Sequence, residues 1–70
     1  MMPLIYADTG AVNIIRKISG KPEVKKHLED MGFVAGAPII VVSMVNGNLI
    51  VNIKETKVAL DKELAAKVMI

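Results

Sequence analysis

The sequence predicts a mostly β fold, a small bent barrel of about five strands formed by one domain that spans residues 1–70. Hydrophobic residues make up 53% of the chain and aromatic residues only 3%. Among the other hydrophobic residues valine and isoleucine are the most numerous, and both favour strands. Turn-forming residues recur about every ten residues, which indicates several short strands. There is no cysteine. The core must therefore be built from aliphatic side chains, without a disulfide or a thiolate zinc site.

After a short apolar start at residues 4–6 and a turn at residues 8–10, a new strand is predicted over residues 11–18. The alternation of this segment is interrupted by the adjacent pair Ile14 and Ile15. Such an interruption predicts a bulge or a sharp bend, and small barrels need bends of this kind. With that bend, Val12 and Ile18 are both expected to point inward.

One short helix is predicted between the second and third strands. Pro22 suits its first turn, and Gly32 suits the left-handed position that follows a helix end. Phe33 is then expected to contact Leu28, as in a Schellman motif, and Gly36 turns the chain into the next strand. The apolar stripe of this helix consists of Val24, Leu28 and Met31.

A hairpin is predicted over residues 39–54, because the pair Asn46-Gly47 is typical of a two-residue type I′ turn between strands. The expected pairs are Val45 with Asn48, Met44 with Leu49, Val42 with Val51 and Ile40 with Ile53. The expected core face therefore consists of Ile40, Val42, Met44, Leu49, Val51 and Ile53. The opposite face, half apolar, consists of Val41, Ser43, Val45, Asn48, Ile50 and Asn52.

The C-terminal segment predicts a strand over residues 58–60, then one helical turn capped by Asp61, and a closing strand over residues 68–70. The closing strand is expected to lie against the N-terminal one. This arrangement of strands, with one short helix between strands two and three and one helical turn before the last strand, best fits an SH3-like barrel.

The order of these features resembles the FeoA family over nearly the whole chain. The features that carry the resemblance are Pro3-Leu4, Gly10-Ala11-Val12, the segment 15–18, Leu28-x-x-Met31-Gly32-Phe33-x-x-Gly36, the Val/Ile hairpin, Ala59-Leu60, Leu64-Ala65 and Val68-x-Ile70. The resemblance implies a small cytosolic accessory protein of bacterial ferrous iron uptake, with the barrel that also occurs in iron-dependent repressors. It implies a membrane permease with a cytosolic GTP-binding domain as the partner.

Catalytic chemistry and cofactor binding are not predicted. The chain has one histidine, two serines and one tyrosine, which form no nucleophile and base pattern. Three possible iron ligands, Glu23, His27 and Asp30, fall on one side of the predicted helix. A helix surface is convex and offers no second layer of groups to orient an imidazole, so we expect these residues to form a solvated charged face without a metal.

A protein partner is therefore the expected ligand. The formal charge of +2 is spread along the chain, which argues against nucleic acid. No apolar run is long enough to enter a membrane and no signal peptide is visible, so the expected location is the cytoplasm. The residues expected to contact the partner are Lys25, Lys26, Met31, Phe33, Val41, Val45 and Ile50. The alternatives are a regulatory domain of a metal-responsive transcription assembly and a structural homodimer.

Overall fold

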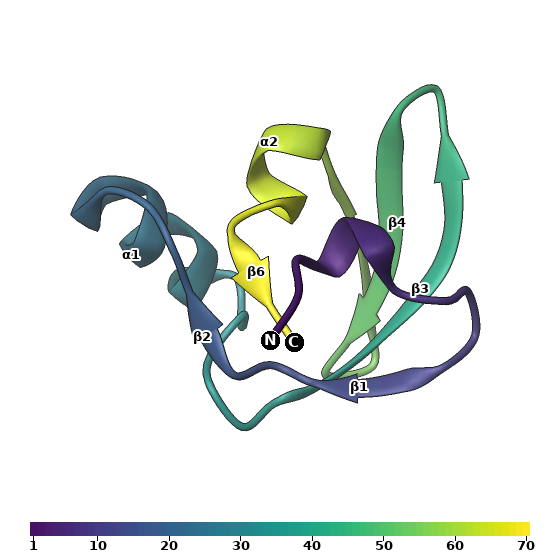
Figure 1. Cartoon of the computed structure of the whole chain (residues 1–70), viewed down its shortest axis with the longest axis horizontal. Coiled ribbons are helices and arrows are strands. Elements are labelled where there is room, and N and C mark those ends of the chain that lie inside the picture. The colour runs from purple at the N-terminus through teal and green to yellow at the C-terminus, as the bar shows by residue number, and fades with distance from the viewer.

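A computed structural model describes all 70 residues as two small antiparallel sheets around one core (Figure 1). The larger sheet has the order β1-β3-β4-β5, and the smaller one pairs β2 with β6. The elements are the 3-10 helix η1 (Leu4–Tyr6), β1 (Val12–Ile14), β2 (Lys17–Ile18), α1 (Pro22–Asp30), β3 (Pro38–Val45), β4 (Asn48–Ile53), β5 (Thr56–Leu60), α2 (Lys62–Ala65) and β6 (Val68–Met69). The mostly β prediction is confirmed, with six strands and with both helices at the predicted places in the order.

The core is wholly apolar. Fifteen residues are buried, and none of them is polar or charged. Burial of apolar area is therefore the main stabilising contribution inside the domain. The largest fully buried side chains are Phe33, Leu4, Ile15, Leu28, Ile39, Leu49, Ile53, Leu60, Val51 and Val68.

The predicted end of the first helix is confirmed. Gly32 has a φ of +101°. Its N–H donates to the Glu29 carbonyl at 2.9 Å, and the Phe33 N–H donates to the Leu28 carbonyl at 3.0 Å. These two bonds define a Schellman motif. Phe33 and Leu28 are both fully buried, so the helix end is anchored in the core.

The hairpin turn is also as predicted, with φ values of 51° at Asn46 and 83° at Gly47. Only the part of the hairpin next to the turn keeps the predicted pairing. A register shift between Val41 and Ser43 leaves Val42 as an extra residue in β3. Beyond this bulge, Val41 pairs with Val51 and Ile39 pairs with Ile53.

The bulge reverses the predicted faces of β3, because a shift of one residue moves each side chain to the other side of a strand. Val41 and Ile39 are buried, whereas Ile40 is half-buried and Val42 is 37% exposed. Met44 keeps its predicted partner Leu49 but is 55% exposed. The predicted core face is thus correct for β4 and wrong for β3.

The bend predicted within residues 11–18 is present, and it divides this segment into β1 and β2, which belong to different sheets. The Ile15 N–H donates to the Ala37 carbonyl at 2.9 Å, and the next N–H, that of Arg16, donates to the Met69 carbonyl at 2.7 Å. Ile18 points inward as predicted, but Val12 is 64% exposed. The prediction for Val12 was wrong because the buried residue at the bend is Ile15.

The C-terminal predictions are confirmed. The Asp61 carboxylate accepts a hydrogen bond from the Leu64 N–H at 2.8 Å and caps α2. β6 pairs with β2. Ile70, which follows β6, forms two backbone hydrogen bonds with Met2. The Met2 N–H donates to the Ile70 carbonyl at 2.9 Å and the Ile70 N–H donates to the Met2 carbonyl at 2.8 Å.

A second tight turn connects β4 to β5 without any residue suited to it. Lys54 and Glu55 have φ values of 49° and 64°, a region that favours glycine and asparagine. The double substitution Lys54→Asn with Glu55→Gly should relieve this strain and stabilise the domain by about 1 kcal/mol. We expect thermal unfolding followed by circular dichroism to shift upward by about 4–8 °C. An unchanged melting temperature would show that the turn carries no strain.

Candidate functional site

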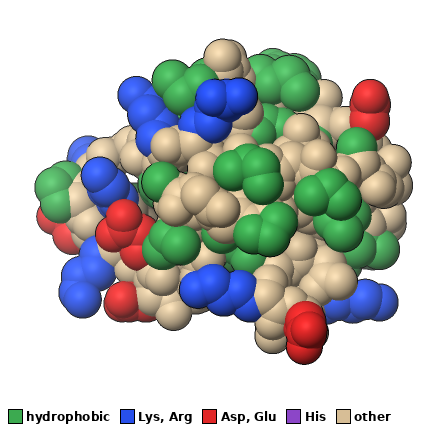
Figure 2. All heavy atoms as spheres, turned by 90° about the horizontal axis from the view of Figure 1, so that it is seen from below, with side chains coloured by type: hydrophobic (Ala, Val, Ile, Leu, Met, Phe, Trp, Pro, Cys, Tyr) green, Lys and Arg blue, Asp and Glu red, His purple; other side chains and the backbone are tan.

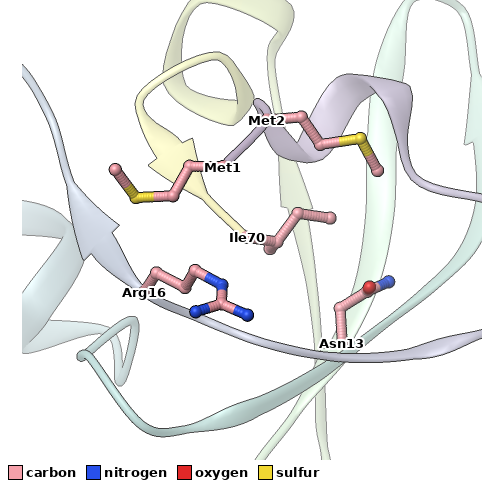
Figure 3. Close-up of a pocket in the computed structure, with 5 residues that line it drawn as sticks. All are labelled: Met1, Met2, Asn13, Arg16 and Ile70. Atoms are coloured by element: carbon pink, nitrogen blue, oxygen red, sulfur yellow. The ribbon is translucent and has the colours of Figure 1, made fainter.

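The largest cavity lies at the opening between the two sheets and has a volume of about 450 Å³ (Figure 3). Its walls differ in chemistry. Asn13 and Arg16 come from β1 and the bend that follows it, whereas the first and last residues of the chain supply the apolar wall. The five lining residues are Met1, Met2, Asn13, Arg16 and Ile70.

Arg16 is the charged group of this cavity, and its guanidinium group extends toward the space between Met1 and Asn13 (Figure 3). The protein has one ion pair, between Lys26 and Asp30 on α1. Arg16 therefore has no carboxylate within 4.0 Å. A guanidinium group without an anionic partner beside apolar side chains can bind a carboxylate in a planar, bidentate manner.

A second exposed feature is the end of the β3–β4 hairpin. Val42, Met44 and Val45 are 37%, 55% and 51% exposed, and we call these three residues the hairpin-tip patch. Met44 and Val45 follow each other in β3 and therefore lie on opposite faces of the sheet, so apolar side chains are exposed on both sides of the hairpin end. Large exposed apolar side chains of this kind often mark a site of protein contact. The sequence predicted the exposure of Val45 but placed Val42 and Met44 in the core.

Two of the predicted contact residues are inaccessible. Phe33 is fully buried as part of the helix end, and Val41 is 5% exposed because the bulge turns it inward. The prediction that they offer apolar surface to a partner was wrong. Of the other residues, Lys25, Lys26 and Val45 are exposed, and Met31 and Ile50 are half-buried.

The structure does not bring the predicted contact residues together. α1, which carries Lys25 and Lys26, lies at one end of the molecule, and the turn between β3 and β4 lies at the other (Figure 1). The molecule extends over 28 × 24 × 23 Å. The two regions are therefore separate candidate sites.

The smaller of the two cavities, about 230 Å³, lies on the outer side of the larger sheet and is lined by Pro38, Ile40, Asn52, Lys54 and Glu55. The Asn52 Oδ1 atom is buried and has no hydrogen-bond partner. A buried acceptor without a donor is unfavourable, so a donor from a bound molecule would stabilise this site. The sequence contained no signal for it.

The three possible metal ligands on α1 do not form a site. No group of three or more His, Asp or Glu side chains is arranged to hold a metal ion. Asp30 instead lies 3.7 Å from the Lys26 ammonium group, and His27 and Glu23 are exposed. These side chains form a solvated helix face.

We therefore expect no Fe(II) site tighter than roughly 10 μM, which corresponds to about −7 kcal/mol of binding free energy. Anaerobic calorimetry on the purified chain is the measurement. A stoichiometric site tighter than this value, lost in His27→Ala, would contradict the expectation. Glu63→Ala, which changes an exposed carboxylate away from α1, is the matched control.

The fold is that of a small SH3-like domain. No helix is both long and apolar enough to span a membrane. The FeoA domain model matches residues 2–70. A relative from Methanocaldococcus jannaschii, whose name assigns it to Fe(2+) transport as protein A, is 31% identical over 70 residues, covering 100% of this chain and 85% of its own. The chain belongs to the FeoA family of accessory proteins of ferrous iron transport.

Solved structures agree with this assignment. An iron uptake regulatory protein (FeoA) is 30% identical, with a TM-score of 0.86 and coverage of 96% of this chain and 89% of that one. FeoA of Stenotrophomonas maltophilia, complexed with zinc and described as a prokaryotic SH3 domain protein, has a TM-score of 0.85 at 20% identity, covering 99% and 88% of the two chains. At this lower identity the second match shows the fold alone. The predicted SH3-like fold is confirmed.

Proposed function

We propose that the chain is a cytoplasmic accessory protein that binds the cytosolic GTP-binding domain of a ferrous iron permease and alters its state. The observation that carries this proposal is the exposure of the hairpin-tip patch, Val42, Met44 and Val45. The turn between β3 and β4 that follows these residues lies at the end of the molecule opposite α1 (Figure 1). The family supports a role in iron transport, and the patch supports a role exercised through protein contact.

We propose no catalytic step for the chain itself. Its histidine is exposed on α1, and its tyrosine is 68% exposed on η1. These two residues are not among those that line the two cavities. General acid or base catalysis needs such a group positioned against a substrate, so these side chains support a binding role better than a chemical one.

The hairpin-tip patch can be tested with Val45→Lys. Because Val45 is 51% exposed, we expect the free energy of unfolding to change by less than about 1 kcal/mol. Binding to the purified cytosolic domain, measured by calorimetry with and without GTP, should weaken at least about tenfold, or 1.4 kcal/mol. Thr56→Lys, at an exposed position at the start of β5, tests whether any added lysine has this effect.

Normal binding by Val45→Lys would move the contact away from the hairpin tip. The double variant Lys25→Glu with Lys26→Glu then examines the other end of the molecule, where both lysines are exposed. A contact made by these lysines should depend strongly on salt, because exposed charges are screened within about 10 Å at 0.1 M ionic strength. Failure of the native chain to bind the domain at all would contradict the proposed function.

A further inference from the structure

β1 is an edge strand with an unpaired side. It is the first strand in the order β1-β3-β4-β5, so only β3 lies beside it in the sheet. The Ile15 N–H donates to the Ala37 carbonyl, which places this residue's backbone groups on the β3 side. The backbone N–H and C=O groups of successive residues point to alternate sides of an antiparallel strand, so those of Asn13 also point toward β3. The N–H and C=O groups of Val12 and Ile14 therefore point to the free edge.

Apart from its short length of three residues, the free edge lacks the features that usually protect such strands. Natural edge strands carry lysine, proline or inward charges that prevent pairing with another chain. β1 instead has the sequence Val-Asn-Ile, with Val12 and Ile14 64% and 51% exposed. They pair with Ile40 and Pro38, so the four side chains share the outer face of the sheet. Figure 2, viewed from the β1 side, shows hydrophobic side chains gathered over this face, with both basic and acidic side chains at its border.

The other side chain of β1 points in the opposite direction. Asn13 faces the cavity of about 450 Å³, together with Arg16 (Figure 3). Successive side chains of a strand lie on opposite faces of a sheet. A strand added beside β1 would therefore direct its own side chains alternately to the apolar outer face and into this cavity.

We propose that the free edge of β1 pairs with an extended segment of the partner in which a carboxylate side chain alternates with apolar ones. The backbone groups of Val12 and Ile14 pair with that segment, and its apolar side chains cover theirs. Its carboxylate enters the cavity, where Arg16 and the Asn13 amide donate hydrogen bonds to it. Main-chain pairing supplies affinity and the alternate pockets supply specificity in complexes of this kind.

Charge complementarity favours an acidic partner over a second copy of the chain. The segment 11–18 contains Arg16 and Lys17 but no acidic residue. In two copies paired antiparallel through β1, with Val12 opposite Ile14, each Arg16 would lie opposite Gly10 of the other copy and would have no carboxylate opposite it. The inference rests on the proposed function, because it describes a segment of the same partner, but it uses a surface separate from the hairpin tip.

Amide hydrogen exchange provides the direct test. The untagged chain is mixed with the purified cytosolic GTP-binding domain of the permease from the same organism, and exchange at each amide is followed by NMR. We expect the Val12 and Ile14 amides, unpaired in the free chain, to exchange at least about tenfold more slowly in the complex. The amides of β5, the other edge of the sheet, should be unaffected.

Two variants test the backbone and the charge separately. Ile14→Pro removes an N–H that points to the free edge and leaves the bonds to β3 in place, and Arg16→Gln removes the cavity's charge at similar size. Each should weaken binding at least about tenfold. Lys57→Gln, an exposed cation on β5, should change binding less than twofold. Arg16 is exposed, so its variant remains a valid test if Ile14→Pro fails to fold.

The outcomes separate this inference from the proposed function. Native-like binding by Arg16→Gln, with the Val12 amide unprotected in the complex and binding lost in Val45→Lys, overturns the inference and leaves the proposed function standing. No binding by the native chain overturns both. Protection of the same amides in the chain alone, increasing with its concentration, identifies a second copy as the occupant and overturns the acidic-segment inference.

Discussion

Val51→Lys is expected to unfold the domain. Val51 is fully buried at the centre of β4, in a core that contains no polar or charged residue. Burial of a lysine in such an environment lowers its pKa by up to 3–5 units, a cost of roughly 4–7 kcal/mol. A domain of this length has a total stability of roughly 3.5–10 kcal/mol. The measurement is circular dichroism together with amide dispersion in a proton–nitrogen NMR spectrum, both of which should report an unfolded chain.

Ile50→Lys, one residue earlier, is the matched control. Ile50 is half-buried on the outer face of the sheet, where the ammonium group of a lysine can reach water while its methylene groups remain on the strand. We expect its free energy of unfolding to stay within about 1 kcal/mol of the native value. A folded Val51→Lys would mean that the β4 core can open to water, and an unfolded Ile50→Lys would mean that the outer face is a second layer of core.

Gly32→Val should give the second-largest loss of stability. The φ of +101° at this residue is unfavourable for any side chain, and a β-branched one adds its own restriction. A Cβ atom there would lie 3.5 Å from the Lys54 Cδ atom, an ordinary contact, so the cost comes from the backbone and not from a clash. We expect a loss of about 2 kcal/mol or more and a fall in melting temperature of roughly 8–16 °C.

Gly32→Asn distinguishes this cause from a general sensitivity of the helix end. Asparagine adopts positive φ more readily than valine, so it should lose clearly less stability. Equal losses in the two variants would point to side-chain bulk, and no loss in either would mean that the helix does not depend on this closure. Chemical denaturation provides the free energies, with an unchanged denaturant dependence as the check that only stability has changed.

Local patterns predicted the parts of the fold in which neighbouring residues decide the backbone. The helix end is an example, because Gly32 and Phe33 complete a motif with residues three to five positions earlier. The Asn46-Gly47 turn and the Asp61 cap are others. Each of these features was located correctly because the side chain that stabilises it lies within the same short segment.

The errors come from interactions between distant segments. The extra residue Val42 is accommodated by pairing across β3 and β4, and nothing in the run from Pro38 to Val45 distinguishes its bulged position from its neighbours. Lys54 and Glu55 are not suited to the positive φ values of their turn, but they form it because β4 and β5 pair on both sides of it. In both places tertiary pairing overrides local preference.

The candidate sites were harder to predict than the fold. The cavity joins residues from the start, the first strand and the end of the chain, and only the closed fold brings them together. The hairpin-tip patch was predicted in part, through Val45, and the error at Val42 and Met44 followed from the missed bulge and from the exposure of the hairpin end. Phe33 was assigned both to the core and to the contact surface, and only the first assignment was correct.

The pairing of Met2 with Ile70 has a consequence for how the protein is handled in the laboratory. Both residues line the large cavity, so an affinity tag fused to either end begins at its mouth (Figure 3). A flexible tag joined this closely has an effective local concentration in the millimolar range. An epitope rich in aspartate would then occupy Arg16 within the same molecule and mask weak ligands of β1. A polyhistidine tag at the same place would add several metal-binding imidazoles to the single one of His27, so iron titrations are meaningful only after the tag has been cleaved.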